Sequence, residues 1–221
     1  MGILKRLKKL AEEAKAAQSQ LDISGIEDPL AKETSWEPLQ RGGSNFKTHV
    51  FKQEGPDVIA FRATTGYILF SSVFFFVGIG ILSLWFFLPA LGEDMGWGGK
   101  IMLGLMGGLF AGVGAFLYIH GTQPTVFDKR HGYFYKGRKN TDKNSEKARV
   151  KHLVKLENIH ALQVLKEYNS GSESSYYSYE INLVLKDSRR VNVIDHGNLQ
   201  QVKDDASRLS EFLNVPIWDV V

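Results

Sequence analysis

The chain has 221 residues, a net charge of +3 at pH 7 and no cysteine. The lack of cysteine excludes disulfides, thiol catalysis and zinc–thiolate sites. The excess of basic over acidic residues is small, and the basic residues are scattered along the chain, which argues against nucleic-acid binding. A chain of this length can supply one small domain in addition to membrane and tail segments.

Residues 1–21 are expected to form an amphipathic helix. Its apolar residues follow steps of four and three, a short heptad seam: Ile3, Leu7, Leu10, Ala14, Ala17 and Leu21. Four basic residues crowd its first turns: Lys5, Arg6, Lys8 and Lys9. A basic start on an apolar-faced helix suits an anionic cytoplasmic leaflet, so these four are predicted lipid contacts. A self-associating coiled coil and docking on the chain's own domain are the alternatives.

Residues 22–46 are interpreted as a linker, because prolines and glycines are spread among charged and small residues. Trp36 and Leu39 are the residues that could pin it locally. Residues 47–66 then predict a β-hairpin before the membrane. Its strands are expected at 49–53 and 57–63, joined by a Glu-Gly-Pro-Asp turn.

The chain is organised around two long apolar stretches, residues 67–91 and 101–119, neither of which contains Asp, Glu, Lys or Arg. As helices rising ~1.5 Å per residue they would extend ~37 Å and ~28 Å, against a hydrocarbon core of ~30 Å. Buried core helices are the alternative, but these are usually shorter and carry a polar stripe. We therefore expect two transmembrane helices.

Glycines recur at a helical spacing in the second stretch. Gly104, Gly108 and Gly112 make two successive GxxxG steps on one face, where a lack of side chains lets another helix approach closely. Two uses stay open, packing against the first stretch and a seam between protomers. Neither stretch has an interior ionisable residue, the usual mark of an ion or proton path, which argues against a carrier.

The basic residues that flank the stretches predict the orientation. Three lie before the first stretch and five lie between residues 129 and 139, whereas the loop at 92–100 has one lysine beside two acidic residues. Lysine and arginine near the ends of a span stay cytoplasmic. Both termini are therefore expected in the cytoplasm.

Residues 124–221 have the pattern of a cytoplasmic antiparallel β domain. Strands are expected at 125–128, 133–136 and 159–168, the last mixed apolar as in a strand covered on both faces. The clearest pattern is the alternation in 177–186, which predicts one buried face formed by Tyr177, Tyr179, Ile181, Leu183 and Leu185.

A return strand and a helix complete this pattern. Residues 190–195 predict the strand, with Val191 and Val193 pointing inward. An amphipathic helix follows, because Asn198 and Gln201 resemble a capping box and apolar residues recur at helical spacing up to residue 212. Asn214 and Pro216 end that helix.

Seven strands and a closing helix, with YEINLVLKDSRRVNVIDHG at 179–197 and LQQVKDDASRLSEFLNVPIWD at 199–219, resemble the pleckstrin-homology-like (PH-like) modules of bacterial integral membrane proteins. The resemblance covers roughly the C-terminal half and includes the basic two-span hairpin. It implies a bacterial inner-membrane location and a domain that binds a partner, a lipid headgroup or itself. If the strands before the membrane join the same sheet, the spans are an insertion in the domain.

We find no catalytic, metal or phosphate-binding motif, and expect no cofactor. The six histidines lack ligand spacing, and Asp195-His196 has no serine or threonine to activate. The one candidate site is the basic stretch 136–151, in which Lys136, Arg138 and Lys139 are the predicted lipid contacts. A plain solvated loop is the alternative.

The fold expected is membrane α+β: an N-terminal amphipathic helix, a two-helix transmembrane hairpin and a PH-like domain. The favoured function is a non-enzymatic scaffold or assembly protein that forms a homo-oligomer in the bilayer and binds a protein partner. The alternative is a channel-like homo-oligomer with the glycine-rich span at its core.

Overall fold

The computed structural model describes residues 22–39, 42, 46–90, 96–138, 151–170 and 175–221, so the helix predicted at 1–21 lies outside the described residues. The chain divides into two compact units. The β unit comprises residues 1–47, 51–61 and 125–221, and the helical unit comprises 48–50 and 62–124. The α+β class predicted from the sequence is confirmed.

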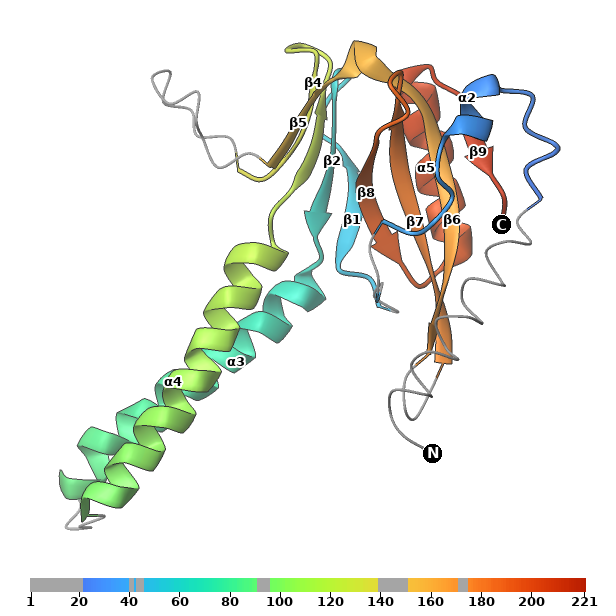
Figure 1. Ribbon diagram of the computed structural model, residues 1–221. Coiled ribbons are helices and arrows are strands. Elements are labelled where there is room, and N and C mark those ends of the chain that lie inside the picture. Colours follow the sequence, from blue (N-terminus) through green and yellow to red (C-terminus); the bar gives the residue numbers. More distant parts are fainter. Residues whose placement is uncertain (1–21, 40–41, 43–45, 91–95, 139–150, 171–174) are drawn as a thin grey trace, which may run out of the picture. The chain divides into compact units, whose positions relative to one another are not determined.

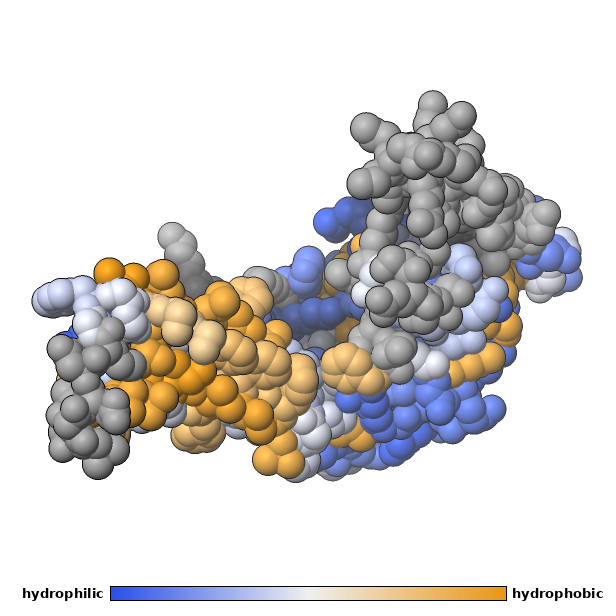
Figure 2. Space-filling view, turned by 90° about the horizontal axis from the view of Figure 1, so that it is seen from below, coloured by the Kyte–Doolittle hydropathy of each residue, from blue (hydrophilic) through white to orange (hydrophobic). Residues whose placement is uncertain are grey.

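The helical unit is a hairpin of two long helices, α3 (Thr65–Ala90) and α4 (Gly96–Gly121), which run side by side (Figure 1). Both are long and apolar enough to cross a membrane. Apolar side chains cover their outer surface, as the orange end of Figure 2 shows. The helices extend slightly beyond the predicted spans at three of their four ends, where residues 65–66, 96–100 and 120–121 continue the helical turns.

A five-stranded sheet contains strands from both sides of the hairpin, in the order β1-β2-β3-β4-β5. Its strands are β1 (His49–Gln53), β2 (Val58–Ala63), β3 (Thr125–Asp128), β4 (Tyr133–Lys136) and β5 (Lys151–Lys155). β2 pairs antiparallel with β3, from Val58 opposite Asp128 to Phe61 opposite Thr125. The strands before the hairpin therefore join the sheet after it, and the hairpin is an insertion between two paired strands.

A four-stranded sheet in the order β8-β7-β6-β9 completes the β unit. Its strands are β6 (Ile159–Ser170), β7 (Ser175–Leu185), β8 (Arg190–His196) and β9 (Ile217–Asp219), and the 3-10 helix η1 (Leu156–Asn158) leads into β6. β6, β7 and β8 form an antiparallel meander, whereas β9 pairs with β6 in parallel. The helix α5 (Leu199–Leu213) lies between β8 and β9 in the chain.

One core joins the two sheets and α5. Phe61, Phe127 and Phe134 come from the five-stranded sheet, and Leu183 and Leu209 from β7 and α5; all five are fully buried. Ile181, Leu183, Leu185 and Val193 point inward as the alternation predicts. Tyr177, predicted on the same buried face, is exposed instead. The Asn198 side chain accepts a hydrogen bond from the Gln201 N–H at 3.0 Å and caps α5, and Asn214 ends it in a left-handed conformation, so both predicted ends are confirmed.

Two expectations differ from the structure. The prediction of one buried face on β7 is wrong, because Ser178, Glu180, Asn182 and Val184 on the other face are buried as well. The reason is that part of the stretch interpreted as a linker covers that face. It contains the short helix α2 (Pro29–Glu33). The second difference is that the sequence reading omitted β5 and β9.

Candidate functional site

Residues 22–39 and 42, which we call the strap, cross the outer face of the four-stranded sheet, the face turned away from the common core. The strap contains α2, whose Ala31 is fully buried against Ala161, Val184 and Trp218. Trp36 adds a ring contact with Trp218, at 6.0 Å between centroids. These contacts form a second apolar cluster, separate from the main core.

α2 starts at the strap's first polar anchor, Asp28. The Asp28 carboxylate accepts a hydrogen bond from the Leu30 N–H at 3.0 Å, and Pro29 occupies the first helical position, where no N–H donor is required. The other carboxylate oxygen lies 2.7 Å from Nε2 of His160 on β6. Partial burial opposes ionisation, but the bonds from His160 and Leu30 outweigh it and lower the pKa of Asp28. The anchor therefore favours a charged Asp28.

Beyond α2, side chains of the sheet bind the backbone of the strap. Gln163 donates from Nε2 to the Ser35 carbonyl at 3.1 Å. Oε1 of Glu180 accepts from the Leu39 N–H at 2.9 Å, and Oε1 of Glu167 accepts from the Gly42 N–H at 3.1 Å. None of these three bonds depends on the identity of a strap side chain.

The outer face is laid out in cross-strand rows, because directly opposed residues share one face of a sheet. Gln163 of β6, Asn182 of β7 and Asn192 of β8 form one row. Glu180 and Asp195 stand opposite each other in the next row. Two like charges so placed repel one another. Glu180 is buried and Asp195 is partly buried.

Burial and this repulsion shift the acid–base behaviour of the face. Burial first, and then the Glu180 carboxylate, raises the pKa of Asp195 to about 6. Lys136, which donates to Oδ1 of Asn192 at 3.0 Å, has its pKa lowered to about 8 by burial, against the opposing effect of Asp195 and Glu180. The Asn182 Oδ1 atom is buried and has no hydrogen-bond partner. The outer face is thus a polar surface whose pKa values and hydrogen bonding depend on the segment that covers it.

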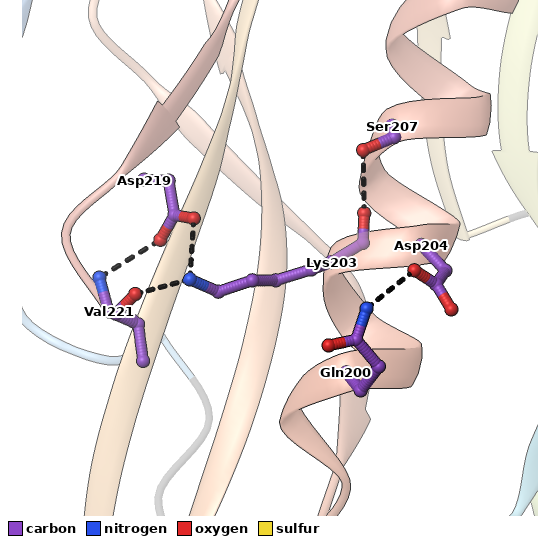
Figure 3. Close-up of polar contacts among 6 residues, drawn as sticks. All are labelled: Gln200, Lys203, Asp204, Ser207, Asp219 and Val221. Atoms are coloured by element: carbon purple, nitrogen blue, oxygen red, sulfur yellow. Dashed lines mark hydrogen bonds and ion pairs between the residues drawn. The ribbon is translucent and has the colours of Figure 1, made fainter.

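The end of the chain holds Trp218 in place beneath the strap. Lys203 of α5 forms an ion pair with Asp219 at 3.0 Å and donates to the carbonyl of Val221, whose own N–H donates to Asp219 at 2.9 Å (Figure 3). Because Asp219 belongs to β9, these bonds tie β9 to α5. The Trp218 ring is consequently a fixed part of the surface that receives the strap.

The hairpin closes on glycines that differ from the predicted stripe. A Cβ atom at Gly107 would lie 2.8 Å from Leu82 Cγ and 2.9 Å from the Gly78 carbonyl oxygen, and Gly78 and Gly114 approach the facing backbone even more closely. Of the three glycines predicted to form the packing face, Gly104 faces Trp85, and a Cβ atom at Gly104 would lie 3.2 Å from the Trp85 ring. Gly108 and Gly112 have open space at the Cβ position. If Gly108 and Gly112 pack against a helix, as predicted, that helix must lie outside the hairpin.

Of the predicted lipid contacts, the structure describes Lys136 and Arg138. Lys136 is half-buried in the bond to Asn192 described above, and Arg138 is exposed just after β4. Lys5, Arg6, Lys8, Lys9 and Lys139 lie outside the described residues. Their contact with lipid stays a prediction.

Other polar groups singled out in the sequence have local partners. Asp195 and His196 point to opposite faces of β8, since one is opposed to Glu180 and the other to Tyr179. Nδ1 of His131 lies 2.7 Å from Asp128, which neighbours it in a turn. Within the part of the chain that the structure describes, no three histidine or acidic side chains gather as a metal site would require.

The strap and the outer face are the functional residues that sequence reasoning missed. Two signals pointed to the strap. Trp36 and Leu39, expected to pin the stretch locally, do contact the sheet through the Trp218 ring and the Glu180 carboxylate. Asp28-Pro29, an N-cap followed by proline, indicates the start of a helix. Comparison of the chain with family models, with curated proteins and with solved structures gives no match.

Proposed function

We propose that this chain is a non-enzymatic integral membrane protein that assembles with copies of itself and holds a PH-like binding domain at the cytoplasmic face of a bacterial inner membrane. The observation that carries the proposal is the insertion of the apolar hairpin between β2 and β3, two paired strands of one sheet. An anchor joined in this way leaves the domain no long tether.

Short joints support the role of the hairpin as an anchor. α3 begins two residues after β2 ends, and β3 begins four residues after α4 ends. At these joints the Thr64 N–H donates to the Thr48 carbonyl at 2.8 Å, and Nε2 of His49 lies 3.1 Å from the Gln123 carbonyl. The segments at the two ends of the hairpin are therefore held by short connections and hydrogen bonds, as expected of an anchor.

Self-assembly is supported by the surface of α4 that the hairpin leaves open. Gly108 and Gly112 contact nothing within 4 Å of their Cβ positions. Leu105, Leu109 and Phe116 are exposed on the same helix. Helix pairs in lipid associate through close packing at small residues, and this surface offers such packing to a second copy.

Two adjacent glycines allow a matched test. Gly108→Leu should insert normally and keep the hairpin's thermal stability, but give a smaller particle in detergent, because it blocks only contacts outside the hairpin. Gly107→Leu should lower thermal stability, because its side chain would overlap Leu82 and Gly78. Particle mass by light scattering and melting temperature are the measurements.

If Gly108→Leu changes neither particle mass nor stability, the open surface does not assemble protomers. Retention of the wild-type chain in membranes after a carbonate wash tests the anchor separately. Release by the wash would contradict the integral membrane location.

A further inference from the structure

The outer face of the four-stranded sheet binds the strap as a protein binds a linear peptide. Gln163, Glu180 and Glu167 supply one donor and two acceptors to the strap backbone at three successive places. Main-chain bonds of this kind give affinity, and side-chain pockets give specificity. Here specificity comes from the rings of Trp36 and Trp218 and from the Asp28–His160 pair.

The polar groups of this face are also unfavourable to bury without hydrogen-bond partners. Glu180 is almost completely buried and receives one of its bonds from the strap. Asn182 is fully buried and already lacks a partner for Oδ1. A buried polar group without a partner is strongly unfavourable, so a segment that covers this face fits it better when it supplies backbone donors, as the Leu39 N–H does.

The strap can leave without disturbing the fold. In the described part of the chain it precedes β1, and it contributes no strand to either sheet. Its apolar contacts belong to the small second cluster and not to the main core. Release of the strap therefore breaks no strand pairing.

We propose that this face is an exchangeable peptide-binding site, and that the strap of a second copy occupies it when protomers assemble. The strap is the one sequence whose fit to the face is seen directly, and a second copy brings the same backbone and the same Trp36. Exchange of an identical element is a low-cost route to dimers. The inference rests on the proposed function and names the segment through which the β units associate.

Cysteine cross-linking in the full-length chain tests the exchange, because the chain has no native cysteine. The Asp28 and His160 side chains meet at 2.7 Å, so Asp28→Cys and His160→Cys in one chain should be joined by a short bismaleimide. Two differently tagged single variants, Asp28→Cys and His160→Cys, are then co-expressed. Exchange predicts a cross-linked dimer of the two tags.

The matched control replaces Asp28→Cys by Lys32→Cys, which lies on the exposed side of α2. This pair should give much less dimer. Cross-linking of the double variant within one chain, without any dimer from the co-expressed pair, would overturn the exchange. An equal yield from the Lys32 control would also overturn it, since collision between the β units would then explain the product.

A second measurement tests the site itself. A fluorescent peptide of residues 22–42 is titrated into full-length Trp36→Ala and wild-type chains, and its anisotropy is followed. The chain's own strap competes at an effective concentration on the order of millimolar, so Trp36→Ala, which weakens that competitor, should bind the peptide at least ~10-fold more tightly. A peptide with Leu39→Ala should bind like the native peptide, because the site uses only the Leu39 N–H.

A peptide with Trp36→Ala should not bind, and equal binding of that peptide would place the interaction elsewhere. No peptide binding by a folded Trp36→Ala chain whose strap has become sensitive to protease would show that the strap is a fixed cover. If circular dichroism shows that Trp36→Ala does not fold, Asp28→Asn, which weakens the opposite end of the strap, takes its place. If these peptide experiments fail but Gly108→Leu gives the expected smaller particle, strap exchange is rejected and the proposed assembly in the membrane is retained.

Discussion

Asp195→Asn should flatten the pH dependence of stability between about pH 4 and pH 6. In the folded chain, burial and the facing Glu180 raise the pKa of Asp195 from 3.8 to about 6. Within this window the folded state therefore retains a proton that the unfolded state has released. Stability falls as pH rises wherever the folded state binds more protons, so the contribution of Asp195 to the stability of the wild-type chain should fall from pH 4 to pH 6.

The shift sets the size of the effect. A difference of about two pKa units, at ~1.36 kcal/mol per unit, corresponds to at most ~3 kcal/mol. For a protein of this size ~1 kcal/mol moves the melting temperature by ~2–4 °C, so Asp195 accounts for at most ~6–12 °C. Burial likewise raises the pKa of Asp205 to about 6, and that contribution remains in the variant.

The assay is thermal unfolding of the full-length chain in detergent, followed by tryptophan fluorescence at the two ends of the window. The acids with lowered pKa values are Asp22, Asp28, Asp128 and Asp187. Their contribution to stability is lost as pH falls below the ordinary value of 3.8, outside the window. Glu211→Gln is the control, because Glu211 is an exposed residue of α5 and should keep the wild-type profile. A profile of Asp195→Asn as steep as that of wild type would refute the reasoning.

Two further predictions test the fold and the topology. Leu183→Asp should unfold the β unit, because a carboxylate in this fully buried position costs several kcal/mol and the free energy of unfolding is only ~5–15 kcal/mol. Lys186→Asp, at an exposed position, is the control. If Leu183→Asp resisted protease as well as wild type does, the assigned inner face would be wrong. Reporter fusions at Gly96 and Val221 should report opposite sides of the membrane, and matching results would exclude the two-span topology.

The strongly periodic elements could be predicted from the sequence. β7 and α5 carry many apolar residues at one spacing, and α5 also has recognisable ends at Asn198 and Asn214. β5 could not be predicted, because it follows a polar basic stretch and contains His152 with a positive φ of 58°. β9 and α2 have three and five residues, too few for a period to show.

The candidate site could not be predicted, because its partners are far apart in the chain. Leu39 and Glu180 are separated by 141 positions, and no local pattern connects them. Ser178, Glu180 and Asn182 alternate with apolar residues and so are typical of a solvent-facing side, yet they are buried beneath the strap. In the hairpin, glycine content indicated close approach, but not that Gly107 would meet α3 while its neighbour Gly108 would not.

The pairing of β2 with β3 has a consequence for how this protein is made. During synthesis β1 and β2 leave the ribosome first, and their partner β3 follows only after both long helices. With the hairpin in the bilayer, the five-stranded sheet can close only when β2 and β3 emerge on the same side. A chain with one helix left outside would keep β3 from β2 and expose an unpaired strand edge, a recognised target for aggregation and degradation. If the hairpin spans a bilayer as we propose, completion of the sheet would thus serve as a check on correct insertion.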